Sequence, residues 1–103
     1  MASERYKVVA AASFEEDLAV ATSYMVERGG TSAVRRLLDR YAELRLLLGV
    51  FPGHGSPVGA DGLRWRELSP FTAVYEYNDA THSVTLLRLH YRSSNWREEF
   101  EAE

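Results

Sequence analysis

The chain has 103 residues, which is enough for one domain and too few for two. Hydrophobic residues make up 46% and charged residues 26%, close to the globular average, so the composition excludes a mainly disordered chain. The absence of cysteine excludes a disulfide scaffold, a thiolate zinc site and a cysteine nucleophile. No apolar run reaches the roughly 20 residues of a membrane span, and the first residues lack the apolar region of a signal peptide. We therefore expect a cytoplasmic protein without a cofactor.

The net charge of −3 is set by the end of the chain. Four acidic residues lie at 98–103, and the body before them carries 12 basic and 11 acidic residues. All but one of the basic residues are Arg, the better bidentate partner for phosphate or carboxylate. A nearly neutral body still lacks the basic excess of a protein that contacts many phosphates, so its charge argues against a large nucleic-acid interface.

The first half of the chain predicts one strand and two helices. Residues 6–12 form a short apolar run with β-branched members, which is typical of a strand. Ser13 and the glutamate three residues later have the spacing of a helix-capping box. Apolar residues at helical spacing then predict a helix over 14–28, a turn at the two glycines 29–30, and a second helix as far as residue 48.

The second half predicts a loop followed by three strands. Glycines and two of the three prolines fill residues 51–62, which argues against regular structure there. Alternating or β-branched and aromatic residues predict strands over 63–68, 71–77 and 83–91, and the short turns between them predict an antiparallel meander.

The expected fold is a single α+β domain over 1–103 with a short acidic tail at 98–103. Its order is β-α-α-β-β-β, with a four-stranded, largely antiparallel sheet and a helical hairpin on one face. The residues expected to be buried are Leu18, Met25, Leu37, Leu38, Tyr41, Leu44, Leu87 and Leu89.

Several kinds of catalytic site are disfavoured by the motifs. The glycine-rich loop has no following Gly-Lys-Ser/Thr and leads into a strand, so it does not predict a phosphate loop. Ser56 lacks the Gly-x-Ser-x-Gly context of a nucleophile. The three histidines, His54, His82 and His90, have no metal-ligand spacing among them.

The last predicted strand carries the most informative side chains. Its alternation places Arg88, His90 and Arg92 on one face, after the apolar Val84 and Leu86. The opposite face holds Thr85, Leu87, Leu89 and Tyr91, of which the last three are expected to face the helices.

A second arginine pair, Arg64 and Arg66, shares one face of a neighbouring strand. Together with Arg88 and His90 it could bind a phosphate and supply an acid or base near neutral pH. The alternative is ordinary cross-strand pairing on a solvated face, for example of Arg88 or Arg66 with Glu76.

The sequence resembles the RelE/ParE superfamily of toxins from type II toxin–antitoxin systems, the plasmid stabilization proteins. The resemblance runs through nearly the whole chain, from YKVVAAASFEEDL through GLRWREL and FTAVYEYND to LLRLHYRSSNW. Its most specific pieces are the Gly-Leu-Arg that opens the second strand, the aromatic FTAVYEY strand and the Arg-x-His of the last strand.

The resemblance implies a functional face. Arg64 matches the arginine of the family's second strand, Arg88 that of the last strand, and His90 the histidine that often follows in ParE-like members. Tyr91 or Arg92 falls where RelE-like members carry functional residues. RelE-like members cleave mRNA on the ribosome without a metal, whereas ParE-like members bind and poison DNA gyrase without chemistry of their own.

The near-neutral body and the short Arg-x-His spacing favour the ParE-like interpretation, with growth arrest through a protein target such as DNA gyrase. The alternatives are a RelE-type mRNA endoribonuclease and a non-toxic domain that binds a partner protein on the same fold. The implied partners are a cognate antitoxin and either gyrase or ribosome-bound mRNA, in a homodimer or a toxin–antitoxin hetero-oligomer.

Leu46, Leu47 and Val26 could receive the antitoxin or could pack under the glycine-rich loop. We expect the acidic tail to be mobile or to lie near Arg88 and Arg92 and screen them.

Overall fold

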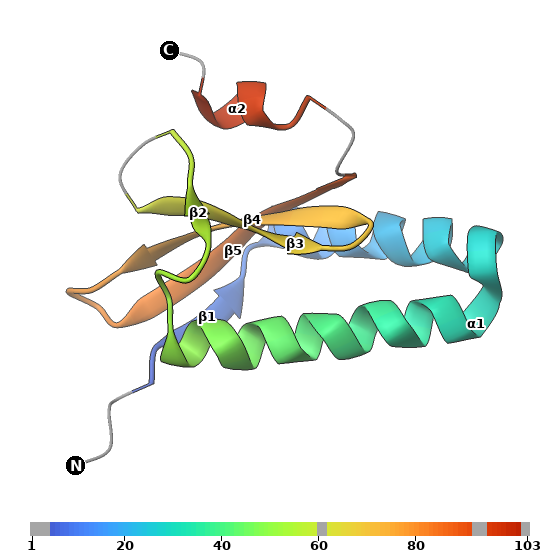
Figure 1. Cartoon of the computed structure of the whole chain (residues 1–103), viewed down its shortest axis with the longest axis horizontal. Coiled ribbons are helices and arrows are strands. Elements are labelled where there is room, and N and C mark those ends of the chain that lie inside the picture. The colour runs from blue at the N-terminus through green and yellow to red at the C-terminus, as the bar shows by residue number, and fades with distance from the viewer. Residues whose placement is uncertain (1–4, 60–61, 92–94, 102–103) are drawn as a thin grey trace.

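The computed structural model of the chain describes residues 5–59, 62–91 and 95–101. The elements, in chain order, are β1 (Lys7–Ala10), α1 (Ala12–Val50), β2 (Ser56–Pro57), β3 (Leu63–Leu68), β4 (Phe71–Asn78), β5 (Ser83–Tyr91) and α2 (Arg97–Glu101). Figure 1 shows one sheet with α1 along one side of it and α2 on the other side.

The helix α1 is a single long element that reverses direction at a glycine. Gly30 has φ 73° and ψ −165°, a left-handed conformation that glycine adopts without a steric penalty. The two halves of α1 run antiparallel on either side of this kink (Figure 1). The predicted helical hairpin is therefore present, but as one folded helix.

The start of α1 differs from the prediction. The helix begins at Ala12 after an N-cap at Ala11 that makes no side-chain cap hydrogen bond, so the predicted capping box is wrong. The Ser13 hydroxyl instead donates to the carbonyl oxygen of Leu87 at 2.6 Å. A serine within the first turn of a helix can serve a neighbouring strand, and the local spacing does not distinguish the two uses.

The sheet has five strands in the order β1-β5-β4-β3-β2, where four were expected. The β3–β4 and β4–β5 pairs are antiparallel, as the meander predicts, while β1 pairs in parallel with the first half of β5. The additional strand is Ser56–Pro57, which pairs with Trp65 and Arg64 inside the segment predicted to be irregular. A two-residue strand has no periodicity that a sequence pattern could reveal.

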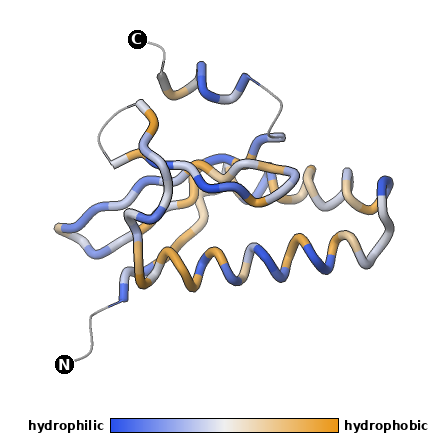
Figure 2. Tube along the Cα trace, viewed as in Figure 1, coloured by the Kyte–Doolittle hydropathy of each residue, from blue (hydrophilic) through white to orange (hydrophobic). Residues whose placement is uncertain are grey.

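The main core lies between α1 and the sheet, and both halves of α1 contribute to it. Phe14 and Ala21 come from the first half and Leu37, Leu44 and Leu48 from the second. They pack on the strand residues Leu68, Phe71, Ala73, Tyr75, Val84, Leu86 and Leu89. Figure 2 shows apolar and polar residues alternating along both halves of α1, the pattern of a helix with one buried face.

Most of the predicted core residues are buried at least in part. Leu37, Leu44 and Leu89 are buried, and Leu18, Met25 and Tyr41 are partly buried against the same cluster. Leu38 is 42% exposed, so its predicted burial is wrong. It lies about 100° around the helix from Leu37, and the buried face is centred on Leu37, Leu44 and Leu48.

A β-bulge in β5 changes which of its side chains face the helices. Tyr75 is paired with Leu86 and Val74 with Arg88, so Leu87 is an extra residue that has no counterpart on β4. Val84 and Leu86 consequently belong to the helix-side core, contrary to the prediction from simple alternation. Leu87 is only half-buried.

The opposite face of the sheet carries a second, smaller apolar cluster. Val58, Val74 and Trp96 are buried in it, with Leu63, Trp65 and Phe100 packed alongside. Trp96 and Phe100 belong to the C-terminal segment, so this segment covers the face that the sequence left open to solvent. The acidic tail, expected to be mobile or near Arg88 and Arg92, is folded as a helix through Glu101.

Candidate functional site

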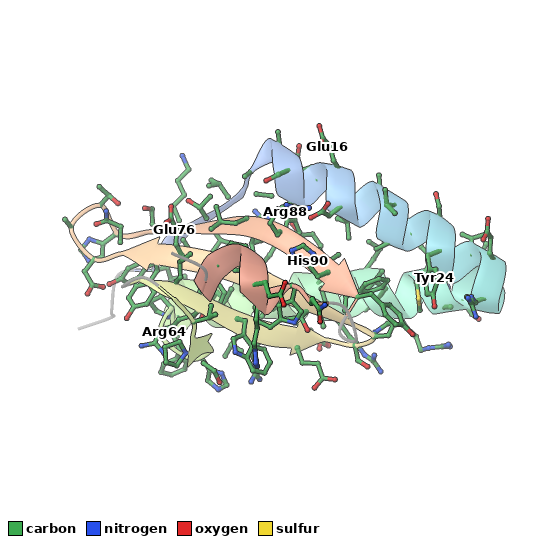
Figure 3. All side chains as sticks on the ribbon, turned by 90° about the horizontal axis from the view of Figure 1, so that it is seen from above. Glu16, Tyr24, Arg64, Glu76, Arg88 and His90 are labelled. Atoms are coloured by element: carbon green, nitrogen blue, oxygen red, sulfur yellow. The ribbon has the colours of Figure 1, made fainter. Side chains whose placement is uncertain are left out.

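Arg88 and His90 project from the second half of β5 on the side away from the main core. Figure 3 shows them side by side, near the first half of α1 and beneath α2. The bulge at Leu87 precedes both residues, and alternation after it keeps them on one face. The sequence prediction that Arg88 and His90 share a face is consistent with this placement.

A carboxylate from α1 holds Arg88. Its Nε donates to Asp17 Oδ2 at 2.7 Å and its Nη2 to Asp17 Oδ1 at 3.4 Å. The same Oδ2 accepts the backbone N–H of Leu89 at 2.9 Å. The cross-strand partner suggested for Arg88, Glu76, lies opposite Leu63 on β3 and Thr85 on β5, so that pairing is wrong.

Asp17 and Ser13 together replace a missing strand. The strand β1 ends at Ala10, opposite Leu86, and leaves the rest of β5 without a strand on that side. One helical turn apart, Ser13 donates to the Leu87 carbonyl and Asp17 accepts from the Leu89 amide. Two side chains of α1 therefore continue the hydrogen bonding of the sheet edge up to the site.

His90 lies under the C-terminal segment. Its ring stacks on Trp96 with centroids 6.5 Å apart and an interplanar angle of 12°, and Phe100 packs edge-on at 6.3 Å. Trp96 in turn contacts Trp65, and the guanidinium of Arg97 lies 5.1 Å from the Trp65 ring and 4.9 Å from the Trp96 ring. The rings of Trp96 and Phe100 thus cover His90, while the exposed Arg97 lies over the two indole rings.

Arg64 does not join Arg88 and His90. Figure 3 shows it at the far side of the sheet from them. Along β3, Trp65 contacts the cluster under α2 while Leu68 belongs to the helix-side core, so Arg64 and Arg66 share the face of α1. Arg64 and Arg66 therefore lie on the opposite face of the sheet from Arg88 and His90, and the expected convergence is not found.

The Arg64 side chain supports the glycine-rich loop. Its Nη1 donates to the Gly55 carbonyl at 2.6 Å and its guanidinium lies 5.7 Å from the Tyr77 ring centre. Beside it, the buried Tyr75 hydroxyl donates to the Pro52 carbonyl at 2.7 Å and accepts the Gly55 N–H at 2.9 Å. A Cβ at position 55 would lie 2.5 Å from the Trp65 carbonyl oxygen, which explains the glycine there.

The remaining two predicted site residues are Tyr91 and Arg92. Tyr91 is 42% exposed and packs edge-on against Tyr24 and Phe71 at the helix side of the sheet, away from His90. A hydrogen bond to Tyr91 is the largest cause that raises the pKa of the Tyr24 hydroxyl. Arg92 lies outside the described residues.

Solved structures with this arrangement come from toxin–antitoxin complexes. One chain of the chromosomal ParDE system of P. aeruginosa superposes with a TM-score of 0.70 at 19% identity, over 86% of this chain and 98% of that one. The chain therefore has the RelE/ParE fold. The RelBE2 complex of Mycobacterium tuberculosis gives a TM-score of 0.64 at 20% identity, over 85% of this chain and 99% of that one.

The RelE/ParE fold extends to archaeal proteins. A chain of the RelE–RelB complex of Pyrococcus horikoshii OT3 gives a TM-score of 0.59 at 16% identity, over 86% of this chain and 97% of the other. No protein-family model and no curated protein matches the sequence. At these identities the likeness establishes the RelE/ParE fold, and the activity has to be argued from this chain's own residues.

Two residues of this RelE/ParE-fold site were missed by the sequence analysis. Asp17 lies one turn after Ser13 on an amphipathic helix, where an acidic residue usually faces solvent. Trp96 has a signal in the sequence, because Trp96 and Phe100 are four residues apart within an otherwise polar tail. That spacing indicates a short helix with one apolar face.

Proposed function

We propose that this chain is the toxin of a type II toxin–antitoxin system and arrests growth by inhibiting a protein target such as DNA gyrase. The observation that carries the first part is the RelE/ParE fold, shared with chains of toxin–antitoxin complexes over 85–86% of this chain. Its cognate partner is accordingly an antitoxin. The described helices include none that is long and apolar enough to cross a membrane.

The arrangement of the arginines favours a protein target over RNA cleavage. Cleavage by attack of a 2′-hydroxyl needs several cations around one phosphate and a group that takes and returns a proton. Here Arg64 and Arg88 lie on opposite faces of the sheet, each with a partner of its own, Gly55 and Asp17. The nearly neutral body also lacks the charge that holds a large RNA.

Under this proposal the target contacts lie around β5. Arg88, one-third exposed at its side chain, and the partly buried His90 are the proposed contact residues. Tyr91 and Arg92 follow them in the sequence and are further candidates. Arg64 acts indirectly, by fixing the loop of residues 52–55. The protein therefore binds its target through the edge of the sheet and performs no covalent step.

Induced expression without an antitoxin tests the proposal. We expect growth arrest with DNA breaks appearing before protein synthesis stops, and inhibition of gyrase supercoiling by the purified chain. Arg88→Ala should relieve the arrest, whereas Arg35→Ala, an exposed arginine of α1, should not. Translation arrest with cleaved mRNA would favour the RelE-type endoribonuclease instead. Unimpaired growth would favour the non-toxic partner-binding domain.

A further inference from the structure

A pocket of about 430 Å³ opens on the α2 side of the sheet, next to the proposed contact residues. Its lining includes Trp65, Glu67 and Thr72 from the sheet and Trp96, Arg97 and Glu98 from the C-terminal segment. Thr72 lies opposite Glu67 on β3 and opposite His90 on β5, so the floor of the pocket is a cross-strand neighbour of His90. The pocket therefore adjoins the surface proposed to bind the target.

The walls of the pocket are aromatic and already receive a cation. The indole rings of Trp65 and Trp96 meet edge to face with centroids 5.7 Å apart. The Arg97 guanidinium lies 5.1 Å from one ring centre and 4.9 Å from the other. Within the described part of the chain, Arg97 forms no ion pair, so it is the negative faces of the rings that hold this cation.

The charge of the pocket is not balanced by Arg97. Two carboxylates, those of Glu67 and Glu98, are among the described lining residues, against the one guanidinium of Arg97. The lining side chains therefore carry one net negative charge. A partner that complements this charge brings a cation to the pocket.

The floor of the pocket offers a hydrogen-bonding group as well. Thr72 is only 3% exposed and is the one buried polar residue in the described part of the chain. No hydrogen bond joins its hydroxyl to another described residue. Because a buried hydroxyl that lacks a partner costs free energy, Thr72 is suited to accept an N–H from a ligand in the pocket.

We propose that this pocket binds an arginine side chain of the protein target, which displaces the Arg97 guanidinium from the indole rings. The proposal rests on the proposed function for the identity of the partner. The incoming guanidinium stacks on the rings and donates N–H groups to the Glu67 carboxylate and the Thr72 hydroxyl. A planar guanidinium fits better than a lysine ammonium, because it stacks flat on an indole while its several N–H groups reach two acceptors.

The first test uses N-acetyl-arginine methylamide as the probe and the chain's own fluorescence as the signal. Both tryptophans of the chain line the pocket, so every change in tryptophan emission reports on it. Millimolar probe should change the emission in a saturable way. The matched control is the citrulline analogue, which has nearly the same shape but no charge and should leave the emission unchanged. Equal changes with both compounds would overturn a site for a cation.

Four variants place the probe in the pocket. Glu67→Gln and Thr72→Val should each weaken probe binding by about threefold or more, and Thr72→Ser, which keeps the hydroxyl, should restore it. Arg97→Gln should strengthen binding, because it frees the rings and removes a like charge. Glu27→Gln, at an exposed position of α1, is the control and should bind like the unaltered chain. Unchanged affinity in both Glu67→Gln and Thr72→Val, or weaker binding in Arg97→Gln, would overturn the pocket.

The second test asks whether the target supplies the arginine. Glu67→Gln should inhibit gyrase supercoiling less than the unaltered chain and slow growth less on induction, with Glu27→Gln unaffected. Full inhibition and full arrest by both Glu67→Gln and Thr72→Val, despite their weaker probe binding, would overturn the target's arginine as the occupant. If the unaltered chain arrests nothing, the proposed function fails, while a saturable titration still establishes the guanidinium pocket.

Discussion

Asp17 and Arg88, 71 residues apart in sequence, form an ion pair that ties α1 to β5, with Nε and Oδ2 2.7 Å apart. The same carboxylate oxygen accepts the N–H of Leu89, so one side chain satisfies both a guanidinium and an edge-strand amide. Both side chains of the pair are largely shielded, with 33% exposure for Arg88 and 19% for Asp17. This contact fixes the direction in which Arg88 leaves the sheet.

The first prediction concerns this contact. Asp17→Ala removes the acceptor of the Leu89 amide and one ion-pair partner of Arg88, which should lower the free energy of unfolding by about 1–3 kcal/mol. Asp17→Asn keeps an amide oxygen for Leu89 and should cost less. Urea unfolding of both variants measures the difference. Asp39→Ala, an exposed position on the same helix, serves as control and should change stability by less than about 0.5 kcal/mol.

If Asp17→Ala were as stable as the Asp39 control, the hydrogen bonds of Asp17 would be exchanged for water at no cost. The Ser13 hydrogen bond to the Leu87 carbonyl would then be the more important contact between α1 and this edge of β5.

The second prediction concerns the hydroxyl that anchors the glycine-rich loop. Tyr75→Phe removes the donor to Pro52 and the acceptor for Gly55, both of them at a buried position. Two unsatisfied backbone groups should cost about 1–3 kcal/mol and raise amide exchange in the loop. Tyr77→Phe, two residues along β4 on the same face, is the matched control, because its ring rather than its hydroxyl contacts Arg64.

Protection of the Gly55 amide from hydrogen exchange gives the sharper reading. It should fall in Tyr75→Phe and not in Tyr77→Phe. Equal protection in the two variants would mean that the Tyr75 hydroxyl does not hold the loop.

The same tyrosine predicts a dependence of stability on pH. Burial raises the pKa of Tyr75 above its usual value of 10.0. The folded state therefore keeps this proton where the unfolded chain has lost it, so the contribution is complete below pH 10 and is lost as the pH rises through the raised pKa. Unfolding free energies measured from about pH 9 to about pH 11 should fall less steeply in Tyr75→Phe than in the unaltered chain. Parallel curves of unfolding free energy against pH for the two proteins would contradict a raised pKa of Tyr75 in the folded state.

The sequence predicts the element types well because each long element has a strong period. Strands over 63–68 and 83–91 have the predicted bounds, and the apolar stripe of α1 leads to Leu37 and Leu44 in the core. The faces of β5 could not be predicted, since one extra residue at Leu87 reverses every side chain before it. Nothing in the local composition marks that bulge.

The site was predicted only in part, for a related reason. Strand β3 has apolar residues in both alternation sets, Leu63 and Trp65 on one face and Leu68 on the other, so its pattern does not say which set meets the helices. Placing Arg64 on the face of Arg88 was one of two equally allowed choices. Once the C-terminal segment covers Trp65, Arg64 must face the other way.

The last prediction concerns the C-terminal segment that covers His90. Trp96 is 7% exposed, and its contacts with Val74, Trp65 and His90 anchor α2 to the sheet. If that anchor holds the whole segment, Trp96→Ala should destabilise the chain as much as truncation after Asn95, because α2 undocks in both. The loss should stay at or below the about 3–5 kcal/mol of a tryptophan removed from a main core, since the α1 side of the sheet is untouched. Thermal unfolding and the emission of the remaining Trp65 measure both effects, with Glu98→Ala as the exposed control in the same segment. A truncated chain clearly less stable than Trp96→Ala would show that Phe100 and the turns of α2 hold the cover without the tryptophan.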